Sequence, residues 1–300
     1  DAFTAKYDYL WRLSDDRWAW EYARRSNKVR RYAESRKPDD ISEMKAPCAS
    51  IRLLKSRVPQ TMAERLGFAF MPDPALNGFE ADVVWTRLAY PDQVEVNCSS
   101  LRPGQTCDIW ERTVPICNIT HITDSIGREF LLIRGKGCVV QVRCTGLSLL
   151  GMEPVRMNLT ISDLDAFERK VKAQKAALSL IGDGPDLTEP RWTKRTAMLR
   201  NGLIALDCLE AGLNRREIAE VIFGKDRVAE DWNGPSLKHS MRYLILKAEA
   251  LRDGGYLVEL LGLRGIGAVR GDRRPSPGAR PGAAGAVLRR PARRGSMRVR

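Results

Sequence analysis

The chain has 300 residues, 43% of them hydrophobic and 29% charged, which is typical of a soluble globular protein of two or three small domains. No apolar run reaches transmembrane length and no signal peptide is recognisable, which argues against membrane-spanning and secreted classes and favours a cytoplasmic protein without a membrane partner. The formal net charge of +13 would indicate an anionic partner. However, residues 263–300 contain eleven arginines and one acid, a net of +10, so residues 1–262 carry only +3.

The residue types that make metal and catalytic sites are scarce. The seven cysteines include no C-x-x-C pair, and the two histidines are His121 and His239. Zinc sites need closely spaced ligand pairs, so we expect no metal and no cofactor, and we interpret the cysteines as reduced, buried thiols. The sequence contains no G-x-S-x-G motif and no Walker loop. We therefore expect a protein that is not an enzyme and has no catalytic residues.

Residues 5–67 are predicted to form a helical N-terminal domain. Ser14 is a candidate helix cap, and Asp15 and Asp16 suit the positive end of the helix dipole that follows. Four aromatic residues within twelve positions are more than one amphipathic helix needs: Trp11, Trp18, Trp20 and Tyr22. Two interpretations stay open. The aromatic side chains dock the helix on the rest of the protein, or they form a surface that binds a partner.

Residues 68–161 change to short β-like runs. The predicted strands are 82–90, 93–96, 128–133, 138–144 and 155–161. The sequence Arg134-Gly135-Lys136-Gly137 is a suitable hairpin connection between the third and fourth of them. In the last run apolar and polar residues alternate, as in a half-buried strand. The segment has a net charge of −2, so we predict a small antiparallel sheet that acts as a spacer or dimerisation element and not as a nucleic-acid surface.

Residues 162–261 return to helical periodicity and are predicted to form a bundle with a helix-turn-helix variant. Asn214 and Glu217 make a capping-box pattern for a short helix that Gly224 ends. After a loop, a longer helix is predicted from about residue 236 to residue 253. A short capped helix followed by a longer one with basic residues near its start is how a major-groove reader is built. The alternative is a helical bundle that binds no DNA.

Five side chains in this bundle are candidate DNA contacts. Arg215 and Arg216 begin the short helix, where they would touch phosphates. Lys238, His239 and Arg242 lie on the polar side of the longer helix and would contact the groove.

The charge of this part of the chain is balanced, because residues 214–262 carry eight basic and eight acidic side chains. Phosphate neutralisation supplies much of the affinity of a protein for DNA. We therefore expect that dimerisation, a protein partner or further arginines add to the contacts of the bundle. The candidate arginines are Arg24, Arg25, Arg30 and Arg31.

The tail at residues 262–300 is rich in arginine, glycine, proline and alanine and is predicted to be disordered, since no apolar periodicity survives in it. Arginine without lysine in such a background is what a GC-rich coding region gives when it is read out of frame. One hypothesis is therefore that the tail is a frameshift or read-through product and that the natural end lies near Leu261. The alternative is an arginine-rich arm that binds nucleic acid without sequence preference.

Two stretches resemble known families. Residues 7–27, YDYLWRLSDDRWAWEYARRSN, resemble the transcriptional regulator-like domain of proteobacterial proteins, whose mark is a W-A-W-E-aromatic-x-R-R-N-like string. The stretches GREFLLIRGKGCVVQVRCTGLSLLGMEPVRMNLTI and GLIALDCLEAGLNRREIAEVIFGKDRVAEDWNGPSLKHSMRYLILKAEALRDGGY are similar to the RovC-like DNA-binding domain family, named after a transcription factor of type VI secretion. The resemblance covers most of residues 7–261. In one departure from the family, Tyr243 and Leu246 stand where it usually carries a denser run of arginines.

The resemblance implies a bacterial transcription regulator with a helix-turn-helix variant. Relatives with both stretches activate excision and transfer genes of integrative conjugative elements, and shorter relatives with only the second act as antiactivators. We therefore expect an α+β chain that binds promoter DNA and activates conjugative-element transfer or secretion genes. RNA polymerase, a small antiactivator protein and further copies of the chain are candidate partners. The competing hypothesis is a protein-binding adaptor or antiactivator that acts on another regulator or on RNA polymerase without binding DNA itself.

Overall fold

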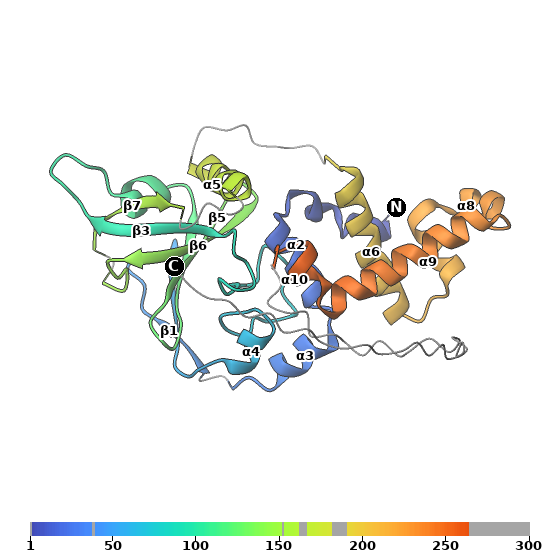
Figure 1. Cartoon of the computed structure of the whole chain (residues 1–300), viewed down its shortest axis with the longest axis horizontal. Helices are drawn as coiled ribbons and strands as arrows, with labels where there is room; N and C mark the ends of the chain where they lie inside the picture. The colour runs from blue at the N-terminus through green and yellow to red at the C-terminus, as the bar shows by residue number, and fades with distance from the viewer. Residues whose placement is uncertain (1, 38–39, 152, 162–166, 182–190, 264–300) are drawn as a thin grey trace, which may run out of the picture. The chain divides into compact units, whose positions relative to one another are not determined.

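The computed structural model of the chain describes residues 2–37, 40–151, 153–161, 167–181 and 191–263. In this part the chain forms helices and one mixed β-sheet, so the fold is α+β as predicted (Figure 1). Of the tail, only Gly262 and Leu263 belong to the described residues, and the prediction of disorder falls on residues outside them.

Seven strands of the described part pair in one sheet, in the order β1-β2-β4-β5-β6-β3-β7. Their bounds are β1 Ile41–Met44, β2 Ile51–Ser56, β3 Val94–Ser100, β4 Asn118–Thr123, β5 Glu129–Gly135, β6 Cys138–Gly146 and β7 Val155–Thr160. The β2–β4 and β3–β6 pairs are parallel and the other pairs are antiparallel. The prediction of a purely antiparallel sheet is therefore wrong. Alternation along one strand shows that the strand exists, but not which strand lies beside it.

Four predicted strands are confirmed as β3, β5, β6 and β7. The predicted hairpin is confirmed as well: Gly135 pairs with Cys138, and Lys136 and Gly137 turn the chain with φ angles of 48° and 70°. Strands β1 and β2 lie within residues 5–67, which were predicted to be helical, and β4 was missed. In β2 every exposed residue is followed by a buried one, but two buried leucines in succession interrupt the alternation that a half-buried strand would show.

The predicted strand 82–90 is wrong. Only Trp85 forms an isolated bridge there, with Phe68. The amide of Trp85 donates to Oε1 of Gln141 at 2.8 Å, and Nε2 of Gln141 donates to the carbonyl of Trp85 at 2.9 Å. A side chain of β6 thus takes the place of a neighbouring strand. Val83, Val84 and Trp85 are all buried because this segment lies between two apolar cores.

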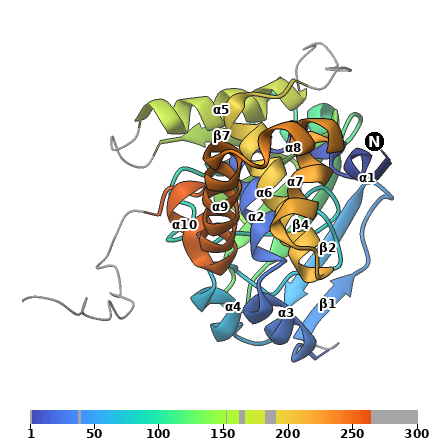
Figure 2. The same cartoon turned by 90° about the vertical axis from the view of Figure 1, so that its right-hand side faces the viewer.

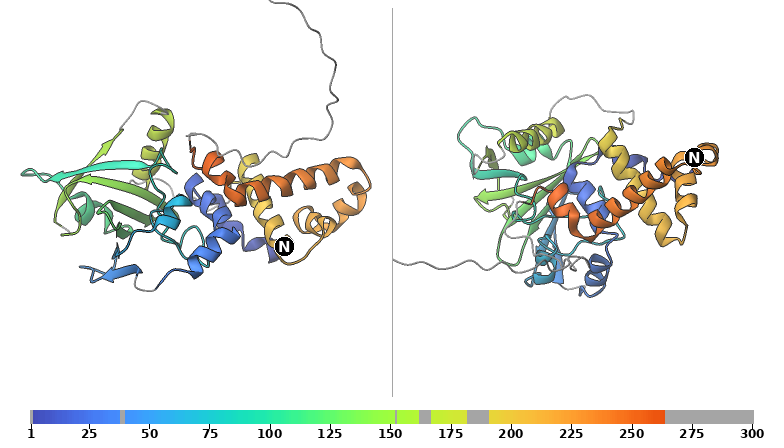
Figure 3. Two further views of the ribbon diagram at one scale, coloured as in Figure 1. Left: turned by 60° about the horizontal axis from the view of Figure 1, so that its bottom comes forward. Right: turned by 45° about the vertical axis from the view of Figure 1, so that its right-hand side comes forward.

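Both faces of the sheet are covered, as the side chains of β5 show. Leu131 and Ile133 belong to one apolar cluster, against which Ala173 and Ala177 of α5 (Phe167–Ile181) pack. Phe130 and Leu132 point to the opposite face and join a second cluster with Phe70 and Val84 from the connecting segment. Beyond that segment lies the third cluster, formed mainly by helices (Figure 3).

This helical cluster takes buried side chains from all three predicted segments of the chain, for example Trp18, Trp85 and Leu203. The helices of the N-terminal segment are α1 Ala2–Ala5, η1 Asp8–Arg12, α2 Asp15–Ala23, α3 Asn27–Glu34 and α4 Thr61–Arg65. The later ones are α6 Lys194–Glu210, α7 Arg215–Phe223, α8 Lys225–Asp231, α9 Pro235–Ala250, η4 Leu251–Gly255 and α10 Tyr256–Glu259. One apolar core crosses the predicted domain boundaries at residues 67 and 161. These boundaries and the one at residue 261 stay predictions.

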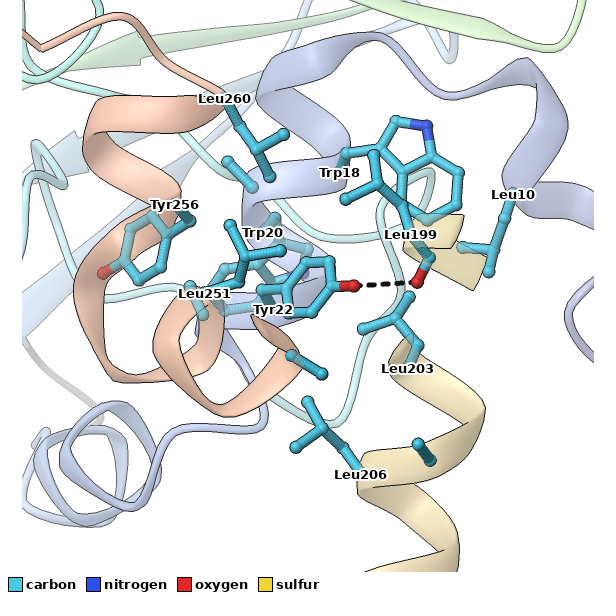
Figure 4. Close-up of a cluster of buried hydrophobic side chains, with 14 of the residues drawn as sticks. Leu10, Trp18, Trp20, Tyr22, Leu199, Leu203, Leu206, Leu251, Tyr256 and Leu260 are labelled. Atoms are coloured by element: carbon cyan, nitrogen blue, oxygen red, sulfur yellow. Dashed lines mark hydrogen bonds between the residues drawn. The ribbon is translucent and has the colours of Figure 1, made fainter. Parts of the chain in front are cut away.

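The aromatic side chains of α2 dock this helix on the rest of the protein. Trp18, Trp20 and Tyr22 are 1% exposed or less. Figure 4 shows them packed among leucines of α6 and residues of η4 and α10, with the hydroxyl of Tyr22 donating to the carbonyl of Leu199 at 2.8 Å. Ser14 precedes the helix as predicted, but its hydroxyl donates to Asp16 and accepts no hydrogen bond from the amides of the first turn. Of the two open interpretations, docking explains these three side chains.

Candidate nucleic-acid interface

The predicted DNA-binding bundle is organised around α6. A capping box between Thr193 and Thr196 begins the helix, and its buried side chains pack against α2 and α9. At Gly202 the helix has no side chain, and an added Cβ would lie 2.5 Å from the hydroxyl of Tyr22 and 3.2 Å from Cβ of Ala248. A glycine at this position lets three helices approach closely. Figure 2 shows α7, α8 and α9 grouped around α6.

A buried ion-pair network joins this bundle to the N-terminal helix α2. The guanidinium of Arg25 binds both carboxylate oxygens of Asp207 and also Oε2 of Glu21, at 2.8 Å. The hydroxyl of Tyr7 donates to Asp207 at 2.6 Å. Burial by itself would raise the pKa of Asp207, but the hydrogen bonds and charge of Arg25 outweigh burial and hold this pKa below its usual value. Burial, followed by the bond to Asp207, raises the pKa of Tyr7. Sequence reasoning missed this network, whose two halves lie about 180 residues apart.

The short helix α7 begins as predicted. Oδ1 of Asn214 accepts hydrogen bonds from the amides of Arg216 and Glu217, and Oε2 of Glu217 accepts one from the amide of Asn214 at 2.7 Å. Gly224 ends the helix with a φ of 90°. Arg215 and Arg216 are therefore held in the first turn, and both are exposed. Nε of Arg216 lies 3.4 Å from Oε1 of Glu220, so this arginine has a partner on its own helix.

A helix that the sequence did not predict, α8, separates α7 from α9. It spans Lys225–Asp231, follows Gly224 directly and buries Val228. The prediction that a loop alone connects the short helix to the longer one is therefore wrong. The connection between α7 and α9 contains a helix of seven residues, about two turns, and is not a simple turn, so the helix-turn-helix assignment stays a prediction.

The longer helix α9 presents a buried and an exposed side. Leu237, Met241, Leu244 and Ala248 form the predicted apolar stripe, and all are buried together with Ile245. On the exposed side lie the three predicted groove contacts, Lys238, His239 and Arg242. Tyr243 and Leu246 are exposed beside them, at 63% and 56%. The structure thus brings these three predicted site residues together on one helix, while Arg215 and Arg216 stand on another.

Ion pairs separate the basic residues of 214–262 into two groups. Four of them pair with a nearby acid: Arg216 with Glu220, Arg227 with Asp231, Lys247 with Glu259, and Arg252 with Asp253. The other four form no ion pair with any residue that the structure describes, and they are Arg215, Lys225, Lys238 and Arg242. Three of these four are predicted site residues. Four acids of the same segment, Glu217, Asp226, Glu230 and Glu249, likewise form no ion pair with a described residue, so the unpaired charges also balance.

The additional arginines of the N-terminal segment are mostly engaged. Arg25 is buried, Arg24 pairs with Glu21, and Arg30 pairs with Glu210 of α6. Arg31 is exposed. Arg24, Arg25 and Arg30 thus meet carboxylates, and a contribution of the four arginines to a DNA contact stays a prediction. Adjacent arginines look alike in the sequence, and only the fold shows which of them meet a carboxylate.

Comparison with known families bears on this part of the chain. Residues 161–261 match the family described as T6SS, Transcription factor, DNA binding domain. The match begins directly after β7, covers α5 to α10 and includes all five predicted site residues. It supports a DNA-binding domain in this third of the chain and DNA as its partner. The resemblance of residues 7–27 to a transcriptional regulator-like domain stays a prediction.

No curated protein matches the chain. In the described part of the chain, no helix has the length and apolar character needed to cross a membrane.

Proposed function

We propose that the chain is a transcription regulator that binds promoter DNA through α7 and α9. The observation that carries this proposal is the set of lysine and arginine side chains that form no ion pair with a described residue of the matched DNA-binding domain. Lys238 and Arg242 are one helical turn apart on the exposed side of α9, and Arg215 begins α7. Cations without an internal carboxylate are free to neutralise phosphates or to bind base edges.

The side chains next to Lys238 and Arg242 on α9 are of types that fit the major groove of DNA. His239 adds a donor and acceptor, and Tyr243 and Leu246 offer exposed apolar surface of the kind that contacts thymine methyl groups. We assign base contacts to Arg242 and His239, and phosphate contacts to Arg215, Arg216 and Lys238.

The regulated genes and the sign of regulation belong to the proposal as well. The description of the matched family names a transcription factor of type VI secretion, which supports a role at secretion genes. Activation of these genes, or of transfer genes of a conjugative element, would require contact with RNA polymerase. An antiactivator protein and further copies of the chain are further proposed partners.

Selection of DNA from a random duplex library tests the proposal most directly. A chain ending at Leu263 is suitable, because it keeps the compact unit of residues 1–264 nearly whole and removes all eleven arginines of the tail. We expect enrichment of one sequence motif. Binding to the selected duplex should weaken steeply from about 50 mM to about 200 mM salt, because several phosphate contacts release counterions.

The competing adaptor function predicts a different outcome. An interface built on Tyr243 and Leu246 is mainly apolar and would respond little to salt. No enriched motif, together with binding of a regulator or RNA polymerase that persists at high salt, would replace DNA binding by the adaptor function.

A further inference from the structure

A cavity of about 410 Å³ lies between α5 and the face of the sheet that α5 covers. Its floor is apolar and comes from neighbouring strands, with Val96 on β3, Val140 and Val142 on β6, and Met157 on β7. Ala177 and Leu178 of α5 form the opposite wall. Concave sites of a few hundred cubic ångströms with apolar walls and a few polar groups are typical of small-molecule binding.

The polar groups of this cavity are concentrated at one carboxylate with two guanidinium groups. Oδ1 of Asp108 accepts hydrogen bonds from Arg112 at 3.0 Å and from Arg156 at 3.1 Å. Oδ2 of Asp108 accepts a third bond from the amide of Met157 at 2.7 Å. Asp108 is buried, so its position and the positions of both arginines are fixed by these bonds.

Two arginines and one aspartate leave a net positive charge at the rim. The side chains of Arg112 and Arg156 are 51% and 33% exposed, and each guanidinium has five N–H donors, of which the bond to Asp108 uses one. Arginine forms strong, often bidentate, hydrogen bonds with carboxylates. The rim therefore offers donors for one more anionic group next to an apolar interior.

We propose that this cavity binds a small carboxylic acid with an unbranched apolar body. The chain of the ligand would lie on the valines of β3 and β6, and its carboxylate would bind Arg112 and Arg156. The apolar surface of Leu159 and Leu178, which line the cavity and are exposed, would be covered by the same ligand. Because α5 falls within the family match at residues 161–261, the ligand would contact the proposed regulator at the start of its DNA-binding part (Figure 1).

Calorimetric titration of the full-length protein with decanoate tests the site, with decan-1-ol as the uncharged probe. We expect saturable binding of decanoate below its micellar concentration and binding of decanol at least tenfold weaker. Arg112→Gln and Arg156→Gln should each weaken decanoate about tenfold and leave decanol unchanged. Either substitution leaves Asp108 with one guanidinium, so folding is preserved. Arg57→Gln removes an exposed charge directly after β2 and should have no effect, which controls for the loss of one positive charge.

A second pair of variants tests the position of the ligand. Val140→Phe fills the cavity from the sheet, and Ala177→Leu fills it from α5. Because the two substitutions act on opposite walls, we expect at least one variant to fold, and circular dichroism identifies it. We expect decanoate binding to fall at least tenfold in each folded variant. Decanoate binding that is equal in the wild-type protein and the filled variants would overturn the site. Equal binding of decanol and decanoate, without an effect of either arginine substitution, would overturn the anionic class of ligand.

Discussion

Arg25, two residues after the end of α2, and Asp207 on α6 form a two-point ion pair across 182 positions of the chain, with Nε–Oδ1 and Nη2–Oδ2 distances of 2.6 and 2.9 Å. The pair connects the N-terminal helix to the centre of the helical bundle. Glu21, Arg24 and Tyr7 bind the same network. Its geometry leads to two predictions on stability.

Removing one partner of this buried pair should destabilise the protein strongly. We expect Arg25→Ala to lower the free energy of unfolding by about 3 kcal/mol, because Asp207 would lose its main partner and the buried Glu21 would lose one of its two arginines. Arg30→Ala is the matched control, since its pair with Glu210 is largely exposed and should contribute less than about 1 kcal/mol. Urea unfolding of the two variants measures the difference. Equal losses would show that the buried pair has no special role.

The same network should respond to acid. The folded state holds the pKa of Asp207 below its usual value of 3.8, so the stability from this group is complete above that value and is lost as the pH falls through the folded pKa. Asp207→Asn should therefore be less stable at neutral pH and lose less stability on acidification toward about pH 3. Thermal unfolding across this range measures both slopes. Parallel slopes for the variant and the wild-type protein would contradict the shift.

Gly202 should not tolerate a methyl group, although alanine favours helices by about 1 kcal/mol over glycine. Its added Cβ would come within 2.5 Å of the hydroxyl of Tyr22, which is fully buried and cannot move away freely. We expect Gly202→Ala to lower the stability by about 1–2 kcal/mol. In a Tyr22→Phe background the hydroxyl is absent, so the same substitution should be neutral or stabilising. A loss that is the same in both backgrounds would place the clash elsewhere.

On DNA, Arg242→Ala should weaken binding to the selected duplex by about 1–3 kcal/mol and relax the preference at one base pair, as expected for a base contact. Lys238→Ala should instead weaken binding to all sequences alike. It should also reduce the slope of log affinity against log salt by about the amount that one phosphate contact contributes. Arg227→Ala is the matched control on the same bundle, since this arginine pairs with Asp231. Fluorescence anisotropy at two salt concentrations gives both quantities. An unchanged affinity of the Arg242 variant would remove it from the interface.

Local signals predicted much of the helical bundle. The capping box at Asn214, the stop at Gly224 and the stripe on α9 depend on neighbouring residues, and the structure reproduces each of them. The signal for β4 was also present, because four of its six residues, at positions 119, 120, 122 and 123, are β-branched.

Long-range features could not be predicted in this way. The carboxylate that Arg25 meets and the cavity beside Asp108 depend on strands and helices that come together only in the fold. Trp85 is the clearest example: its β-like neighbourhood predicted a strand, yet it is packed between Phe68 and Tyr256 and held by Gln141. A short apolar run that is buried on both sides cannot be told from a buried strand by its sequence pattern alone.

The shared helical core limits how the DNA-binding part can be rearranged in evolution. A shorter protein that kept the equivalent of residues 161–261 without α2 would expose the surface of α6 that Trp18 and Tyr22 cover here. Such a protein would need a substitute for these aromatic side chains. A helix supplied by another chain would serve, so that a contact that is internal in this protein would become a means of recognition between two.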